Sequence, residues 1–381
     1  MLSKSIIPVY AIGSHIVSSL GAGVEAHWAA AGAGITGIRL HNKPELSSAP
    51  FMGSLVGEEM WGNINEVLQS GAILSPFEQL AAFSVKKVIE KIPLIFTNDD
   101  TIFILSATKG NIEWLGKVPD SRLSLHHSAS VIAKYLRFTG KHVVISNACT
   151  SGIAALIYGL RALQTGRYKH AVVCGCDRFS RFVLAGFQSF MAVSDAPCRP
   201  FDAARNGITL GEAAATIILS VEATDKPVAQ LASGATTNDA NHISGPSRTG
   251  EELSLAINRT LLSGGVEARQ VSMVSAHGTA TLYNDEMEAK AFALSGLVNA
   301  PVHSFKGYVG HTLGAAGVLE CAVAVECFRY QKTIPSLGFE QLGVSMPLNI
   351  TTTAQPATIS NILKTASGFG GCNAAVLWAR V

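Results

Sequence analysis

Two segments of the 381-residue chain resemble each other, and this internal repeat limits the fold more than any other feature. Residues 149–156 and 311–318 share threonine, glycine and alanine at equivalent steps, and both open a stretch rich in small residues. Glycine and alanine let two helices approach closely, so we expect these helices to pack together at the centre of a duplicated fold. That packing would bring Cys149 near His311. A chance similarity between two buried helices is the alternative.

The predicted strands indicate a layered fold. Short runs of β-branched and apolar residues alternate with Ala- and Leu-rich stretches, and strands are expected at residues 101–106, 142–146, 171–174 and 215–219. Strands that are apolar throughout occur where helices cover both faces of a sheet. The pattern therefore predicts the α/β class.

The length of the chain favours two halves. Single domains usually span about 100–200 residues, and this chain is longer. Residues 221–227 are mostly polar and end in a proline, as expected of a join between domains. We therefore expect an N-terminal half at 1–228, which carries Cys149, and a C-terminal half at 229–381.

Composition narrows the class of partner and the compartment. A net charge of +2 without a polybasic run gives no reason to expect nucleic-acid binding. Seven cysteines, mostly inside apolar segments, favour a reducing cytoplasm over a secreted disulfide framework. No apolar stretch reaches the roughly 20 residues of a membrane span. The short apolar run at residues 6–12 contains Pro8 and predicts a first strand rather than a signal peptide.

Cys149 is the candidate nucleophile. It follows the strand expected at 142–146, and a helix is expected to begin directly after it. The partial positive charge at a helix N-terminus favours thiolate, the reactive form of cysteine. A buried structural thiol is the alternative for this cysteine taken alone.

Two histidines lie at the ends of predicted elements in the C-terminal half. A strand delivers His277, and a second strand end leads to Lys306 and, five residues later, to His311 at the start of a helix. Imidazoles in such positions can donate hydrogen bonds to a transition state. Each histidine alone is more commonly structural, and only the combination with Cys149 indicates a site.

A glycine-dense segment at residues 367–373 precedes an apolar strand expected at 374–378. Glycines permit backbone conformations that aim N–H groups at a developing oxyanion. An ordinary tight turn is the alternative.

Four motifs, in this order, resemble those of the β-ketoacyl-[acyl carrier protein] synthases. They are Asn147-Ala148-Cys149-Thr150-Ser151-Gly152, Ala276-His277-Gly278-Thr279-Ala280-Thr281, the segment from Lys306 to Gly317, and Gly368-Phe369-Gly370-Gly371-Cys372-Asn373. The match looks like the elongating branch with a Cys-His-His site, and it covers nearly the whole chain. The resemblance implies a duplicated thiolase-like fold with five layers, αβαβα, that is usually paired as a homodimer.

The resemblance also implies a role for the central residues. Cys149 would accept an acyl group from an acyl carrier protein, and His277 and His311 would stabilise the enolate that forms when malonyl carrier protein loses carbon dioxide. The backbone N–H groups of Cys149 and Phe369 would hold the oxyanion in the loop that includes Gly370. Phe369 would also act as a gate.

Further roles follow from the same resemblance. Lys306 would orient the site, with Glu320 as its carboxylate partner. Thr279 and Thr281 would line the tunnel for phosphopantetheine. No cofactor or metal is expected, because phosphopantetheine arrives on the carrier protein.

Some positions depart from the family pattern. Ser367 replaces a phenylalanine of many fatty-acid synthases, and residues 282–284 replace the usual Pro-x-Gly, although Asp285 and Glu288 keep their family positions. Met191 lies where several relatives place a carrier-docking arginine. These departures resemble synthases of specialised polyketide or polyene pathways as much as those of fatty-acid synthesis.

Three alternatives remain. A thiolase would act on free coenzyme A and would need a second catalytic cysteine, for which Cys372 is the candidate. A chain-length-determining subunit would be a non-catalytic partner, so a heterodimer with a related subunit is also conceivable. A metal site at Cys174 and Cys176 lacks a second ligand pair nearby.

Overall fold

The structure is a computed structural model that describes residues 7–71, 73–92, 99–138, 140–223, 229–240 and 245–381. Within these residues the strands form one twelve-stranded mixed sheet and one three-stranded sheet. The small sheet contains β3 (Arg39–His41), β4 (Phe51–Ser54) and β8 (Leu210–Gly211). The domain boundary predicted at residue 228 lies outside the described residues, so it stays a prediction.

The large sheet repeats one topology twice. The order β1-β9-β7-β5-β6 has two antiparallel pairings followed by two parallel ones, and the order β10-β15-β14-β11-β12 has the same succession of pairings. The two halves join where β1 pairs with β10. The repeat seen in two sequence segments is therefore a duplication of the whole fold.

The bounds of the strands follow this order. The N-terminal half contains β1 (Tyr10–Ser18), β9 (Ala213–Ser220), β7 (His170–Asp177), β5 (Thr101–Ser106) and β6 (His142–Ile145), and β2 (Gly21–Ala22) pairs with β1. The C-terminal half contains β10 (Ala229–Asn238), β15 (Cys372–Ala379), β14 (Asn361–Gly368), β11 (Met273–Ser275) and β12 (Pro301–His303), followed by β13 (Asn349–Ile350). The strands predicted at 101–106, 142–146, 171–174 and 215–219 are confirmed. β5, β7 and β9 are buried along their whole length, whereas β6 is half-buried.

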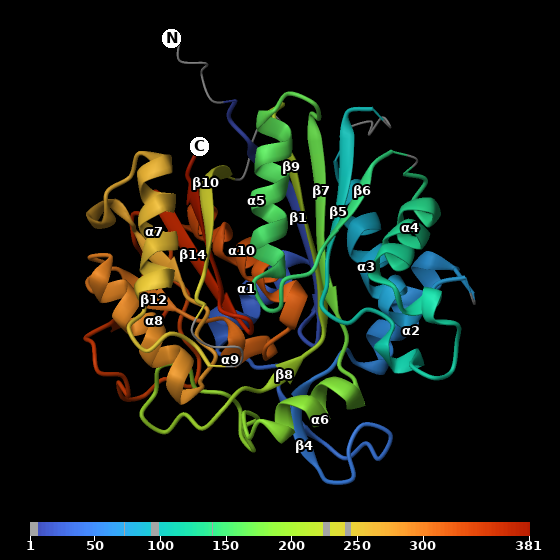
Figure 1. Cartoon of the computed structure of the whole chain (residues 1–381), viewed down its shortest axis with the longest axis horizontal. Coiled ribbons are helices and arrows are strands. Elements are labelled where there is room, and N and C mark those ends of the chain that lie inside the picture. Colours follow the sequence, from blue (N-terminus) through green and yellow to red (C-terminus); the bar gives the residue numbers. More distant parts are fainter. Residues whose placement is uncertain (1–6, 72, 93–98, 139, 224–228, 241–244) are drawn as a thin grey trace.

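The helices complete five layers. The outer helices are α3 (Pro76–Ile89) and α4 (Leu125–Tyr135) on one side, and α7 (Glu251–Gly264) and α8 (Leu282–Leu294) on the other. The central helices α5 (Ser151–Gln164) and α10 (Ala316–Ala324) contact strands of both halves. Figure 1 shows α5 and α10 in the middle of the molecule, between the two outer pairs. The predicted αβαβα architecture is confirmed.

The remaining helices lie around these layers. They are α1 (Val24–Ala33), α2 (Glu58–Leu68), α6 (Arg181–Ser189), the short α9 (Lys306–Val309) and α11 (Glu326–Tyr330). Among the described residues, none of the helices is both long and apolar enough to cross a bilayer.

The two central helices touch through glycines. A Cβ atom added at Gly152 of α5 would lie 2.8 Å from the backbone nitrogen of Val318, and one added at Gly317 of α10 would lie 2.6 Å from the backbone nitrogen of Ile153. Both distances are shorter than a carbon atom can occupy, and the obstacles are backbone atoms that cannot move independently. The expected packing of the two small-residue helices is confirmed.

We expect Gly317→Ala to destabilise the fold by about 1–3 kcal/mol, the usual cost of overpacking a dense core. Gly62 of α2 is a matched control, because an added Cβ there meets no atom within 4 Å. Gly62→Ala should stabilise by about 0.5–1 kcal/mol, because alanine loses less backbone entropy in a helix. Urea unfolding of both variants measures the change in the free energy of unfolding. Equal changes in the two variants would show that the helix contact is not as tight as described.

Candidate active site

Cys149 lies on a tight turn between a strand and a buried helix. β6 ends at Ile145, and α5 begins only after the turn. Ala148 has a φ of 46°, a left-handed conformation that is costly for alanine. The hydroxyl of Ser151 accepts a hydrogen bond from the Asn147 N–H at 2.8 Å and donates one to the Ala148 carbonyl at 2.6 Å. These bonds hold the turn and point the thiol out of the helix end.

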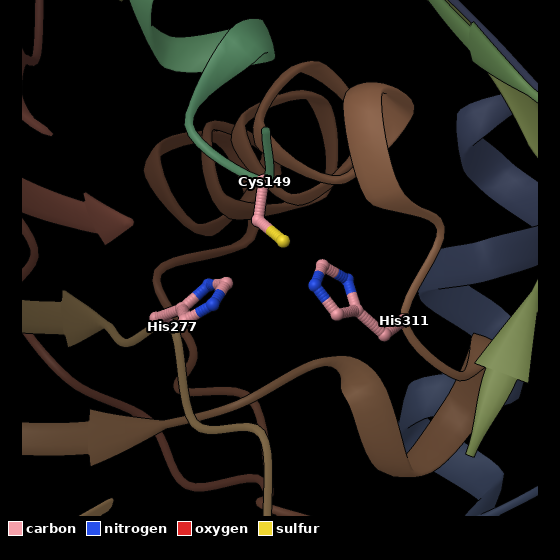
Figure 2. A group of neighbouring side chains, drawn as sticks. All are labelled: Cys149, His277 and His311. Carbon is pink, nitrogen blue, oxygen red and sulfur yellow. The ribbon is translucent and has the colours of Figure 1, made fainter. Parts of the chain in front are cut away.

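Three side chains converge from the two halves. Figure 2 shows the sulfur of Cys149 directed between the imidazoles of His277 and His311. The sulfur and one nitrogen of each ring lie within 4.8 Å of one another, and the two ring centroids are 5.3 Å apart at an interplanar angle of 83°. All three side chains are buried. The structure thus assembles the predicted Cys-His-His group.

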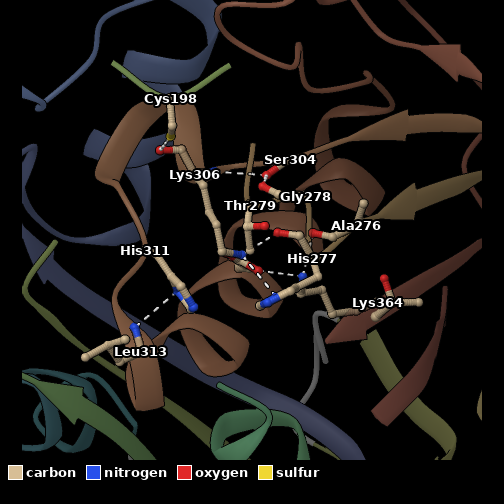
Figure 3. Close-up of polar contacts among 12 residues, drawn as sticks. Cys198, Ala276, His277, Gly278, Thr279, Ser304, Lys306, His311, Leu313 and Lys364 are labelled. Carbon is tan, nitrogen blue, oxygen red and sulfur yellow. Dashed lines mark hydrogen bonds and ion pairs between the residues drawn. The ribbon is translucent and has the colours of Figure 1, made fainter. Parts of the chain in front are cut away.

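Hydrogen bonds on the far side of each ring fix where its proton resides. The N–H of Leu313 donates to Nδ1 of His311 at 3.3 Å, and the ammonium of Lys306 lies 3.4 Å from Nδ1 of His277 (Figure 3). In both rings Nδ1 is therefore the acceptor, and Nε2 carries the proton. Nε2 of His311 has no hydrogen-bond partner among the described residues. Each ring thus presents an N–H donor to the site.

Three buried charged groups lie behind the histidines. Lys306 donates to Glu320 at 2.7 Å and to the His277 carbonyl at 2.5 Å. Lys364 of β14 donates to the other oxygen of Glu320 at 2.5 Å and to the Ala276 carbonyl at 2.8 Å. The pairing of Lys306 with Glu320 was predicted from the resemblance. The second lysine was not, and it leaves two cations for one carboxylate.

Burial and these charges set the protonation states. Burial, and next to it the charge of Lys306, lowers the pKa of His277 well below its usual value and that of His311 to about 3. Burial also raises the pKa of the Cys149 thiol to about 12, although Lys306 opposes this. Burial therefore outweighs the helix N-terminus, and the resting group is a thiol with two neutral imidazoles. The sequence had indicated a thiolate.

Two carboxylates on α8 hold the loop that carries His277. Glu288 accepts the N–H groups of His277 at 2.7 Å and Gly278 at 2.8 Å, and Asp285 accepts that of Thr279 at 3.0 Å. Burial raises the pKa of Asp285 to about 6, although a hydrogen bond from the Phe201 N–H opposes the shift. These bonds explain why both acids occupy their family positions although neighbouring residues differ.

A cavity of about 340 Å³ opens onto the three side chains. Thr279 and Thr281 line it, as predicted, and their hydroxyls are 3.0 Å apart. The hydroxyl of Thr281 also accepts the Asn284 N–H at the start of α8. Thr281 therefore supports the loop as well as facing the cavity.

Phe369 stands over the cavity and is held by two aromatic rings of the N-terminal half. Its ring stacks on Phe187 at 5.6 Å and meets Phe190 edge-on at 5.7 Å, and all three rings line the cavity. A Cβ at Gly368 would lie 3.0 Å from the Cys149 nitrogen, so a side chain there would press on the backbone of the nucleophile turn. Gly370 has a φ of 86°, as the predicted turn requires.

The other cysteines do not join the site. The thiol of Cys372 donates to Oδ1 of Asn147 at 2.8 Å, while its neighbours Gly371 and Asn373 line the cavity. Successive strand residues point to opposite faces, which explains the difference between Cys372 and Asn373 of β15. Cys174 and Cys176 are fully buried in β7.

The same three side chains are also potential metal ligands. Within the described residues, Cys149 and the two histidines form the one group of three or more His, Cys, Asp or Glu side chains whose ligand atoms lie within 4.8 Å of one another. A structural zinc site needs four such ligands. The group suits nucleophilic chemistry better than a closed metal site.

Comparisons with known proteins indicate one family. The family model described as "Beta-ketoacyl synthase, N-terminal domain" matches residues 113–224, and the model of the C-terminal domain matches residues 228–340. A "Putative polyketide beta-ketoacyl synthase 1" from Streptomyces halstedii is 32% identical over 265 residues. That match covers 65% of this chain and 63% of the relative, so it spans less than two thirds of the relative's length.

Solved structures show the same fold. The ishigamide ketosynthase/chain length factor matches with a TM-score of 0.87 and 22% identity, over 99% of this chain and 100% of that one. A ketosynthase solved with its type II polyketide acyl-carrier protein and bound to a hexaketide matches with a TM-score of 0.82 and 19% identity. That match covers 99% of this chain and 100% of the ketosynthase.

We expect the ring signals of His277 and His311 to keep the neutral form from about pH 8 down to about pH 5, whereas a free imidazole titrates near pH 6.5. The reason is that protonation would place a new cation beside Lys306 in a buried site. Nitrogen NMR of the histidine rings measures this, and His277→Gln and His311→Gln assign the signals. A midpoint near 6.5 for either ring would contradict the description.

Proposed function

Because the chain belongs to the β-ketoacyl synthase family, we propose that it catalyses a decarboxylative Claisen condensation and makes a 3-oxoacyl thioester on an acyl carrier protein. One observation carries the proposal: a thiol and two neutral imidazole donors from separate halves converge on one buried cavity. This arrangement places a nucleophile beside two groups that can stabilise a negative oxygen.

The first step loads the acyl group. The sulfur of Cys149 attacks the carbonyl carbon of an acyl carrier thioester, the carbon–sulfur bond to the carrier breaks, and the thiol proton leaves with the phosphopantetheine sulfur. The backbone N–H groups of Cys149 and Phe369 stabilise the oxyanion of the intermediate. The product is an acyl thioester on Cys149 and a free carrier thiol.

The second step forms the new carbon–carbon bond. Malonyl carrier protein enters, and the Nε2–H groups of His277 and His311 donate to its thioester oxygen. The bond to the carboxylate breaks, carbon dioxide leaves, and the two imidazoles stabilise the enolate. The enolate carbon attacks the acyl carbonyl on Cys149, the carbon–sulfur bond breaks, and the sulfur takes a proton from solvent. Because both rings start neutral, they act as hydrogen-bond donors and not as proton-transfer acids.

Other predicted residues support these steps. Lys306 orients His277 through its carbonyl and its ring, and Glu320 satisfies the buried charge of that lysine. Thr279 and Thr281 bind amides of the phosphopantetheine arm along the cavity. Phe369 gates the cavity. The protein needs no cofactor of its own in this scheme, since phosphopantetheine arrives on the carrier.

We propose an acyl carrier protein and a second subunit as partners. Solved relatives include one named as a ketosynthase with its chain length factor and one bound to its acyl-carrier protein. The second subunit is a copy of this chain or a related chain-length subunit. The polyketide synthase among the curated relatives supports a specialised pathway as well as fatty-acid synthesis.

A thiolase activity is less well supported. Such an enzyme needs a second cysteine in the site, and the thiol of Cys372 instead donates a hydrogen bond to the side chain of Asn147. A non-catalytic chain-length subunit needs none of the Cys-His-His group, which is complete here.

Incubation with acyl carrier thioesters should add one acyl mass to the wild type and none to Cys149→Ala, as measured by intact-mass spectrometry. Cys372→Ala is the matched control and should keep the adduct. Addition of malonyl carrier protein should then remove the acyl mass and release a 3-oxoacyl carrier. Acyl mass on both cysteine variants alike would exclude Cys149 as the sole acceptor.

Two further outcomes separate the alternatives. Formation of acetoacetyl coenzyme A from acetyl coenzyme A alone would indicate a thiolase. A wild type that never becomes acylated and is required only beside another synthase would indicate a chain-length subunit.

A further inference from the structure

Lys364 is a buried cation that the proposed reaction does not yet use. It lies in the middle of β14, between Leu363 and Thr365, and its side chain is fully inaccessible to solvent. Its ammonium contacts Glu320 and the Ala276 carbonyl. A lysine in this position must surrender its hydration, so its retention in an apolar strand requires an explanation.

The stability of the site does not require a second lysine. Lys306 and Glu320 alone would form a neutral pair in direct contact at 2.7 Å. Lys364 adds an unbalanced positive charge to that pair, and burial lowers the pKa of Lys364 although Glu320 opposes this. Buried ionic groups are often no more stabilising than apolar side chains of similar volume. The surplus charge therefore indicates a role in the chemistry of the site.

The two lysines bind consecutive carbonyls next to a catalytic ring. Lys364 holds the carbonyl of Ala276, and Lys306 holds that of His277. Glu320 of α10 connects the two ammonium groups, so β14, α9 and α10 are joined at the peptide that carries His277. Lys364 is thus placed to act on the ring through both the backbone and its charge.

Other titratable groups also lie around the two rings, and none of them is altered in the Lys364 variants. They include the thiol of Cys149 and the imidazole of His303. Three carboxylates accept hydrogen bonds from backbone N–H groups nearby. Glu288 accepts those of His277 and Gly278, Asp285 accepts that of Thr279, and Asp177 accepts that of Gly314. Burial, and next to it the charge of Lys364, lowers the pKa of His303 to about 3. The thiol and His303 are therefore neutral.

The substrate changes the electrostatics of this chamber. A malonyl group brings a carboxylate into a site of low polarity, and a nearby negative charge favours protonated imidazole. A histidine that took up a proton would lose the neutral donor form described above. Resting on the proposed function, we propose that Lys364 is a positioning residue whose charge keeps His277 and His311 neutral while the malonyl anion is bound.

The test uses the full-length protein and follows the rate of malonyl carrier decarboxylation against pH. Lys364→Met keeps the length of the side chain and removes its charge. We expect the acid limb of the rate profile to move up by about one pH unit or more, which corresponds to about a tenfold loss of rate where the wild-type limb begins. Acylation of Cys149, measured separately by mass spectrometry, should remain, because it does not require the malonyl anion.

A double variant distinguishes charge from packing. Lys364→Met with Glu320→Gln restores the single net positive charge through Lys306 alone, so the acid limb should return toward the wild-type position. Lys290→Met is the matched control, since Lys290 pairs with Glu286 on α8 outside the site, and its profile should equal that of the wild type. If Lys364→Met does not fold, Lys364→Gln removes the same charge and keeps a polar group for the Ala276 carbonyl.

Failure of the Lys364 proposal can be distinguished from failure of the proposed function. A wild type that is neither acylated nor able to condense would overturn the proposed function. An active wild type with an unshifted acid limb in the Lys364 variants would overturn only the role of Lys364. A double variant at least as impaired as the single one would assign Lys364 to packing, and would also overturn this role.

Discussion

The contact between Gly152 and Gly317 is the constraint on which the site depends. Cys149 lies two residues before the start of α5, and His311 precedes the turn that leads into α10, so the distance between these helices sets the distance between the thiol and the imidazole. A side chain at either glycine would collide with backbone of the other helix. The duplicated fold therefore does more than bury a large core. It places the ends of two equivalent helices, one from each half, at the same point.

Burial at that point determines the kind of chemistry that is available. A solvent-exposed histidine changes its charge near neutral pH, whereas His277 and His311 stay neutral beside two buried lysines. The rings therefore serve as fixed N–H donors. In the proposed condensation such donors would need no reorganisation when an enolate forms, and a low-polarity site strengthens each hydrogen bond. The same burial keeps Cys149 a thiol in the resting site.

The sequence predicted the features that depend on neighbouring residues. It did not predict contacts between elements that are far apart in the chain. The turn at Cys149, the segment from Lys306 to His311 and the small-residue helices could all be recognised, because each depends on neighbouring residues. Lys364 was missed although a lone lysine inside the apolar strand Ile362-Leu363-Lys364 was a visible signal. Its partners come from α10 and from the end of β11, and pairing across elements cannot be deduced from one strand. Phe187 and Phe190 were missed for the same reason, since only the fold places them on Phe369.

Side chains from both halves form the entrance to the cavity, as they form the Cys-His-His group. Phe369 belongs to the C-terminal half, and the rings of Phe187 and Phe190 that hold it belong to the N-terminal half. Ser367 donates a hydrogen bond to Asn373 at 2.7 Å and lines the cavity together with Cys149. Phe369 therefore rests on two ring contacts across the halves. Any movement of α6, whose last turns carry Phe187, would alter both the width of the entrance and the position of the loop that contacts the Cys149 nitrogen.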